Sequence, residues 1–264
     1  MAIPGTLLIS EAFSLYRTDF IAMKNQSPKT EEGYINAGKL LLAFKGDIDI
    51  CNLTFDDVRD WRLHLTTWQK PDTVKNNVCC LRMVLKFLQK RLYPVLDYEE
   101  IPVAKRAKRT IKFLNEEEMG RFILETGRKR RGYSPINRAR NVALVEVLYA
   151  TGLRVSELCS LDRDTIKNRT YTIVGKSEDP RIGFINEQAE RALDTYLSLR
   201  TDNNKALFIS PQTGKRITTK IVRLIFQNIC NRSEEFNDVH PHTIRHSYGT
   251  KLLGRRVDLR YIGD

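Results

Sequence analysis

The stretch NRARNVALVEVLYATGLRVSEL, residues 137–158, decides how the second half of the chain folds. Residues 137–150 are apolar nearly all round a helix, which predicts a helix that is buried on every side. Gly152 is well placed to end this helix, because glycine readily takes the left-handed backbone found at many helix ends. The chain therefore turns at Gly152, and Arg154 follows the turn directly.

A lysine lies in a predicted hairpin loop farther along the chain. The runs 171–174 and 181–185 are rich in β-prone residues, and the segment between them contains Gly175 and Lys176. Two short β-prone runs around such a segment predict a β-hairpin. Lys176 is therefore expected in its turn.

The segment HPHTIRH, residues 240–246, concentrates groups that bind phosphate or transfer protons. His242 and Arg245 are three residues apart, so a helix would present both on one face. The candidate catalytic residues are therefore Arg154, Lys176, His242 and Arg245.

The rest of the second half, residues 113–264, is predicted to be mainly helical. Asn115 or Leu114 precedes the helix start at the three glutamates 116–118, and an acidic first turn suits a helix N-terminus. Further helices are expected at 187–200, 217–231 and 243–253. With one hairpin among them, the predicted fold class is mainly α with a small β-sheet.

The first half, residues 1–94, contains four apolar stripes at helical spacing, of which the longest runs from Val74 to Leu92. Four amphipathic helices with short connections predict a small helical bundle. Residues 95–112 contain Pro102 and lack such a stripe, which predicts an extended linker between two domains. Its basic residues are Lys105, Arg106, Lys108 and Arg109.

The chain is strongly basic, with 44 Lys and Arg against 32 Asp and Glu and a formal net charge of +12. Such a protein is drawn to polyanions, of which nucleic acid is the commonest. Lys75, Arg82 and Lys86 gather on or beside the fourth predicted helix. Taken alone, this pattern suits a face that tracks DNA phosphates and a plain solvated face equally well.

Several classes of protein are disfavoured by the sequence. It contains no run of about 20 apolar residues that would span a membrane, and its first residues do not resemble a signal peptide. The five cysteines include no CxxC pair, which favours reduced thiols in the cytoplasm. The cluster His240, His242 and His246 could bind zinc, but the cysteines lie at no ligand spacing. We therefore expect no metal site and no membrane segment.

The motif Thr-Gly-Leu-Arg-x-Ser-Glu-Leu, followed far downstream by Pro-His-x-x-Arg-His with a Gly-Lys hairpin between them, resembles the tyrosine recombinases, the phage-integrase and Xer-type family. The match covers the second domain to the chain end. The first half resembles the core-binding domain of the family only in architecture and charge. The resemblance implies a site-specific recombinase or integrase that needs no cofactor. Its tyrosine attacks the scissile phosphate, forms a 3′-phosphotyrosine link and releases a 5′-hydroxyl.

The resemblance also assigns roles to the candidate residues. Arg154 and Arg245 would grip the phosphate, because a planar guanidinium can bind two oxygens and stays charged. His242 would donate to a phosphate oxygen or handle the proton of the nucleophile. Lys176 would protonate the departing 5′-oxygen.

Two residues beside these are expected to support them, and the nucleophile is not among the motifs. Glu157 would orient Arg154 or its helix, and His246 occupies the usual position after the second arginine. The family's Gly-His or Gly-Trp element and catalytic tyrosine would lie beyond Asp264. We therefore expect this chain to bind DNA phosphate without cleaving by the family route.

The expected partners are double-stranded DNA, clamped between the two domains, and further copies of the chain, as a homotetramer on two DNA sites. The expected location is the cytoplasm, at the nucleoid. Three alternatives stay open: an inactive DNA-binding regulator of recombination sites, a nuclease or topoisomerase-like relaxer, and an unrelated basic helical protein. The sequence does not choose between a phage, a transposon, an integron and a chromosome-dimer system, nor does it indicate the target site.

Overall fold

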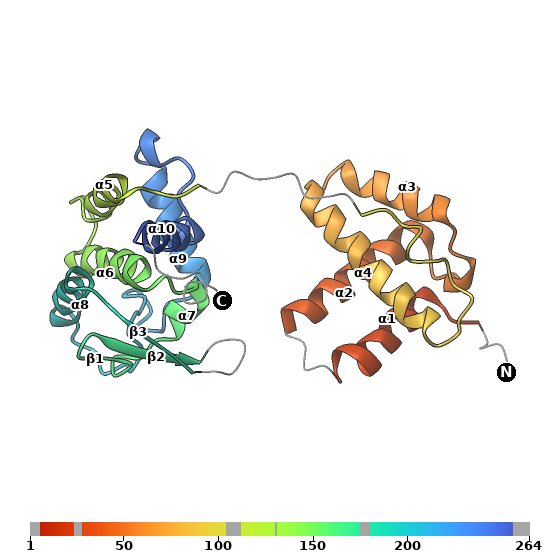
Figure 1. The fold of residues 1–264 in the computed structure, drawn as a ribbon, viewed down its shortest axis with the longest axis horizontal. Helices are drawn as coiled ribbons and strands as arrows, with labels where there is room; N and C mark the ends of the chain where they lie inside the picture. The colour runs from red at the N-terminus through yellow and green to blue at the C-terminus, as the bar shows by residue number, and fades with distance from the viewer. Residues whose placement is uncertain (1–5, 24–27, 104–111, 130, 175–179, 256–264) are drawn as a thin grey trace. The chain divides into compact units, whose positions relative to one another are not determined.

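The computed structural model describes residues 6–23, 28–103, 112–129, 131–174 and 180–255. The chain divides into two compact units, Met1–Lys108 and Arg109–Asp264 (Figure 1). Each unit has its own apolar core. In the described part of the chain, no helix combines the length and the apolar content that crossing a bilayer requires.

The first unit is helical, as the four apolar stripes predict. Its elements are α1 (Ile9–Tyr16), a π-helical turn η1 (Arg17–Ile21), α2 (Pro28–Lys45), a 3₁₀ turn η2 (Ile50–Asn52), α3 (Phe55–Thr66) and α4 (Pro71–Gln89). Thr54 caps α3 by accepting a hydrogen bond from the backbone N–H of Asp57, which satisfies one of the free donors at a helix start. Trp61 of α3 and Leu81 and Leu85 of α4 are fully buried in the core.

The longest stripe extends less far than expected. Helix α4 ends at Gln89, and Leu92 lies in the left-handed region at φ +64° with 67% of its surface exposed. Pro94 disfavours helical backbone at Tyr93, so a helix cannot easily continue through this residue. The chain reverses there, with the N–H of Tyr93 donating to the carbonyl of Leu88.

The segment after this turn packs against the first core instead of forming a free linker. Ile101 is only 2% exposed, and Val95, Leu96 and Tyr98 pack beside the buried cluster. The first unit therefore extends past Pro94, the boundary that the sequence predicted. The basic residues of the expected linker, Lys105, Arg106, Lys108 and Arg109, lie outside the described residues.

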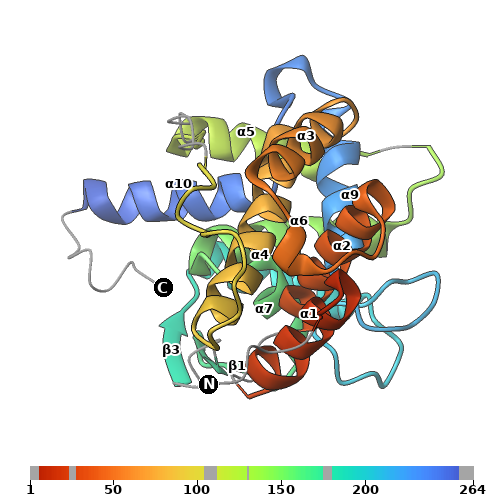
Figure 2. The same cartoon turned by 90° about the vertical axis from the view of Figure 1, so that its right-hand side faces the viewer.

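The second unit is mainly helical with one small sheet, which confirms the predicted fold class. Its helices are α5 (Glu116–Thr126), α6 (Pro135–Thr151), α7 (Val155–Ser160), α8 (Glu187–Ser198), α9 (Thr219–Cys230), a 3₁₀ turn η3 (Glu234–Phe236) and α10 (Pro241–Gly254). Figure 2 shows α5 and α10 side by side. The backbone N–H of Leu114 donates to Ser247, and Lys251 pairs with Glu116, so the start of α5 is fastened to α10.

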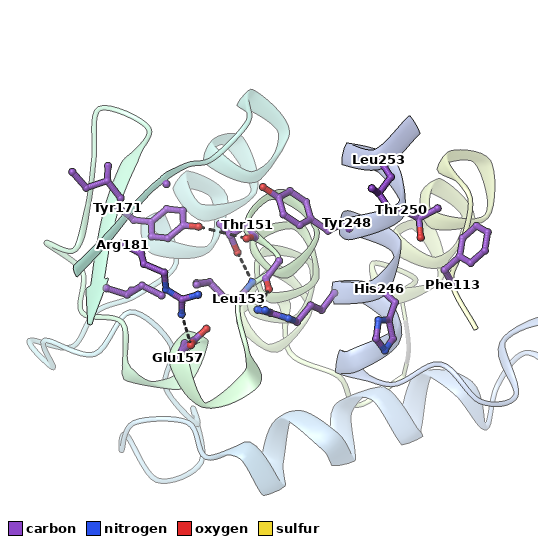
Figure 3. Close-up of a pocket in the computed structure, with 16 residues that line it drawn as sticks. Phe113, Thr151, Leu153, Glu157, Tyr171, Arg181, His246, Tyr248, Thr250 and Leu253 are labelled. Carbon is purple, nitrogen blue, oxygen red and sulfur yellow. Dashed lines mark hydrogen bonds and ion pairs between the residues drawn. The ribbon is translucent and has the colours of Figure 1, made fainter. Parts of the chain in front are cut away.

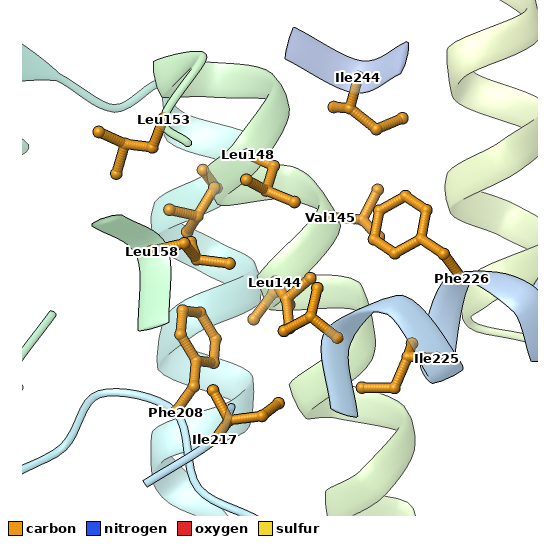
Figure 4. Close-up of a cluster of buried hydrophobic side chains, with 14 of the residues drawn as sticks. Leu144, Val145, Leu148, Leu153, Leu158, Phe208, Ile217, Ile225, Phe226 and Ile244 are labelled. Atoms are coloured by element: carbon orange, nitrogen blue, oxygen red, sulfur yellow. The ribbon is translucent and has the colours of Figure 1, made fainter. Parts of the chain in front are cut away.

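Helix α6 forms the centre of the second core, as its apolar surface predicts. It packs against α5, α8 and α10, and Leu144, Val145 and Leu148 are completely buried. Figure 4 shows these side chains meeting Phe226 of α9 and Ile244 of α10. A buried central helix gives the turn that follows it a rigid base.

The sheet is antiparallel, in the order β1-β2-β3. Strands β2 (Thr170–Val174) and β3 (Pro180–Phe184) form the predicted hairpin, and Tyr171 is paired with Gly183. The two-residue strand β1 (Ile166–Lys167) was not predicted. Its brevity leaves no alternating pattern from which it could be recognised.

Candidate active site

The glycine turn after α6 positions the rest of the site. Gly152 has φ +63° and caps α6, as the sequence predicts. A Cβ at this position would also lie 2.3 Å from the ring of Tyr248 on α10. Only glycine satisfies both the left-handed backbone and the close packing of α10.

Arg154 and Glu157 are joined at the start of α7. Arg154 is the N-cap residue, and its backbone N–H donates to Glu157 Oε2 at 2.7 Å. Its guanidinium Nη1 donates to Glu157 Oε1 at 3.1 Å, and the Arg154 side chain is 41% exposed. Glu157 therefore holds both the backbone and the end of Arg154, while the guanidinium remains open to solvent.

Arg245 reaches the same turn from α10. Its Nη1 donates to the backbone carbonyl of Gly152. Burial, then the charges of Arg154 and Arg181, lower the pKa of Arg245. An arginine still stays protonated at neutral pH, because its ordinary pKa lies above about 12. The fold thus brings positive charges together at the cost of mutual repulsion, and a bound anion would relieve that cost.

His242 lies close to this cationic cluster, on the first turn of α10. Partial burial lowers the pKa of His242, and the surrounding charges of His240, His246, Arg245 and Arg223 lower it further. A lowered pKa keeps the imidazole neutral at physiological pH. A neutral imidazole can accept a proton at one nitrogen and donate from the other.

The other two histidines flank His242. His240 caps α10, since its Nδ1 accepts a hydrogen bond from the backbone N–H of Thr243 at 3.1 Å. The ring of His242 lies 6.3 Å from that of His240 and 6.4 Å from that of His246, between centroids. Within the described ranges, no group of His, Cys, Asp and Glu is arranged to hold a metal ion.

A cavity of about 540 Å³ opens between the sheet and α10, beside the glycine turn. Figure 3 shows Arg181, Glu157 and Tyr171 on one side and His246 and Tyr248 on the other. Arg245 also contributes to the lining. The cavity is therefore lined by both polar and charged groups next to the motif residues.

Tyr171 forms part of the wall, and its side chain is buried. Burial raises the pKa of Tyr171 to about 12, so its hydroxyl stays protonated at neutral pH. Its ring lies across Gly183, where a Cβ would be 2.3 Å from the ring. The ring fixes how β2 and β3 meet beneath the site.

Sequence reasoning missed Arg181, the second residue of β3. Its Nη2 donates to Glu157 Oε1 at 2.8 Å. Along β3 the burial alternates, with Arg181 and Gly183 half-buried and their neighbours exposed. An arginine at an inward position next to the predicted hairpin loop was the available signal. Lys176, in that loop, lies outside the described residues.

Two of the three predicted DNA-binding residues of α4 contact the segment that follows this helix. Arg82 Nη1 donates to the backbone carbonyl of Ile101 at 2.5 Å. Lys86 Nζ lies 5.0 Å from the ring centroid of Tyr98, within the range of a cation–π contact. Lys75 lies at the edge of a small apolar cavity of about 100 Å³. The segment that follows α4 therefore engages two of the three basic side chains.

The sequence of this chain is similar to a known protein family and to characterised relatives. Residues 112–264 match the phage integrase family. The tyrosine recombinase XerC of Bacillus pumilus is 30% identical over 254 residues, which cover 90% of this chain and 82% of that protein. XerC of Oceanobacillus iheyensis is 31% identical over 256 residues, covering 90% and 81%.

Solved structures agree with this relationship at the level of the fold. The Tn1549 transposon integrase in complex with circular intermediate DNA aligns with a TM-score of 0.74 at 16% identity, covering 97% of this chain and 90% of that one. A lambda integrase tetramer bound to a Holliday junction gives a TM-score of 0.74 at 11% identity, covering 97% and 76%. The chain therefore belongs to the phage integrase family, and its relatives are tyrosine recombinases that break and rejoin DNA at specific sites.

Proposed function

We propose that Arg154 and Arg245 together bind the scissile phosphate of duplex DNA during site-specific recombination. The observation that carries the proposal is the hydrogen bond from Arg245 to the carbonyl of Gly152. It brings the arginine of α10 to the turn that carries Arg154. Two forked cations at one turn suit a phosphodiester, whose charge is redistributed as it reacts.

The remaining residues take part in proton transfer. A tyrosine attacks phosphorus and forms the 3′-phosphotyrosine bond as the bond to the 5′-oxygen breaks. Lys176 gives its proton to that oxygen. His242, neutral because of its lowered pKa, takes the proton of the nucleophile or donates to a phosphate oxygen. His246 supports His242 from the next turn of α10.

The proposal extends to the assembly and to its location. The DNA backbone is contacted by Lys75 and Lys86 and by the basic residues between the two units, which are Lys105, Arg106, Lys108 and Arg109. Four copies act together on two duplex sites. Solved structures of lambda integrase support this arrangement, since that protein forms a dimer on a core site and a tetramer on a Holliday junction. A protein that acts on DNA works where the DNA lies, which places it at the nucleoid in the cytoplasm.

The test measures binding, because the arginine pair grips phosphate before any bond breaks. A duplex that the chain itself selects from a random pool serves as the probe. Arg154→Ala and Arg245→Ala are each expected to weaken binding roughly eightfold at 0.1 M salt and to reduce the slope of log affinity against log salt by about 0.9, the loss of one phosphate contact.

Arg191→Ala is the matched control. Arg191 lies on α8 with 76% of its side chain exposed and pairs with Glu187, so its loss removes one charge away from the glycine turn. The salt slope of this variant should match that of the unmodified chain. Unchanged slopes in both the Arg154 and Arg245 variants would refute the proposal.

A further inference from the structure

The carboxylate of Glu157 is shared between two arginines from different elements. Its Oε2 accepts the backbone N–H of Arg154. Its Oε1 accepts from the guanidinium groups of both Arg154, at 3.1 Å, and Arg181, at 2.8 Å. The Glu157 side chain is only 12% exposed, and Figure 3 shows Arg181 directed at it from the sheet. The carboxylate thus ties α7 to β3.

The two guanidinium contacts are unequal. Arg181 makes the shorter hydrogen bond to the oxygen that both share, and Arg154 makes the longer and weaker one. Without Arg181, the charge of Glu157 would be balanced mainly by Arg154. An arginine that neutralises a protein carboxylate binds a phosphate less strongly, because the two anions compete for its donors.

The sheet fixes Arg181 in this position. Arg181 is paired with Ile173 across the β2–β3 ladder, and Ile173 is buried in the second core. Tyr171 and Gly183 lock the neighbouring pair by direct contact. The guanidinium therefore projects from a rigid strand, unlike a lysine or arginine on a surface loop.

We propose that Arg181 is a positioning residue, which balances the charge of Glu157 so that this carboxylate holds Arg154 in place without neutralising it. This inference rests on the proposed function, since it takes Arg154 to be a phosphate-binding group. Arg181 acts through Glu157 and does not itself contact the DNA.

A double-mutant cycle separates this role from direct contact. Arg181→Gln is expected to weaken binding to the selected duplex roughly eightfold at 0.1 M salt, with the salt slope falling by about 0.9, because Glu157 then occupies Arg154. In the Glu157→Gln background the same change is expected to have no effect on affinity or slope. A direct phosphate contact predicts the full loss in both backgrounds, and that result would overturn the inference.

Two further variants control for folding and for charge. Arg181→Lys keeps a cation beside Glu157 and is expected to bind within about twofold of the unmodified chain. An eightfold loss in this variant, with its thermal unfolding unchanged, would count against the inference. Arg191→Gln, which removes an exposed charge on α8, should leave the slope unaltered.

The same experiments distinguish failure of the inference from failure of the proposed function. Arg154→Ala reports on the proposed function alone. If it lowers the salt slope while Arg181→Gln does not, Arg154 binds phosphate without help from Arg181, and only the inference is wrong. If Arg154→Ala and Arg245→Ala both leave the slope unchanged, the proposed function is wrong whatever Arg181 does.

Discussion

The two units hold their basic side chains in different electrostatic surroundings. On α4, Arg82 donates to a backbone carbonyl and Lys86 lies over the ring of Tyr98. At the glycine turn, Arg245 also donates to a carbonyl, but its close neighbours include another arginine, Arg154, which lowers its pKa. A cation over an aromatic ring is stabilised by packing. Arg154, Arg181 and Arg245 outnumber Glu157, the carboxylate that they surround, so this turn favours a further anion and is the stronger sign of a phosphate site.

The largest effect is expected when arginine is exchanged for lysine in each unit. Arg245→Lys keeps the charge but loses the fork that serves the Gly152 carbonyl and a phosphate together. Strand cleavage is expected to fall by at least about 100-fold. The measurement is covalent adduct formation on a nicked duplex.

Arg82→Lys is the counterpart on α4. Its cleavage rate is expected to change by less than about twofold, as for most surface substitutions. Equal losses of cleavage rate in the Arg82 and Arg245 variants would show that the two units use their arginines in the same way. The difference drawn between the units would then be wrong.

A second experiment concerns the turn on which the site is built. Gly152→Ala imposes a left-handed backbone that costs about 1–2 kcal/mol, and its Cβ would overlap the Tyr248 ring, which adds about 1–3 kcal/mol. Gly214 has a similar φ of +65° with open space around it. Gly214→Ala should therefore carry the backbone cost alone. Chemical denaturation measures both, and equal losses would mean that the contact of α10 with the turn contributes nothing.

Within the first unit, Lys75 and Arg82 are expected to contribute differently to DNA binding. Lys75→Gln is expected to lower the salt slope of DNA binding by about 0.9, as for one lost phosphate contact. Arg82→Gln should leave the slope intact and cost about 1–3 kcal/mol of stability, because the carbonyl of Ile101 loses its donor. Salt titrations of DNA binding measure the slope of each variant, and chemical denaturation measures its stability. A lower slope for Arg82→Gln would make α4 a uniform phosphate-binding face.

The elements that the sequence predicts correctly are those encoded by patterns between residues close together in the chain. The buried α6 follows from its apolar surface, the turn from Gly152, and the β2–β3 hairpin from two β-prone runs around Gly175. Each signal lies within about 20 residues, where periodicity and turn chemistry act directly. The motif arginines could be named because their boxes are local as well.

The features that the sequence did not predict depend on contacts between segments far apart in the chain. Arg181 meets Glu157 across two elements, and no spacing along the chain encodes that meeting. The packing of Tyr98 and Ile101 on the first core was likewise hidden, because prolines and charges around them resemble a linker. Tertiary contact decides such positions, and composition alone does not reveal it.

The smallest effect is expected from removing one of the cations around His242, which tests whether its charge acts on the imidazole. Arg223 on α9 is one of the charges that lower the pKa of His242, so Arg223→Gln should raise that pKa toward its ordinary value, as followed by NMR titration of the ring. Because the folded state takes up this proton less readily than the unfolded state, His242 stabilises the fold above its unfolded pKa. That contribution is lost as the pH falls through the folded pKa. Arg191→Gln should leave the titration unchanged. An unmoved midpoint in Arg223→Gln would mean that the charge of Arg223 does not act on His242.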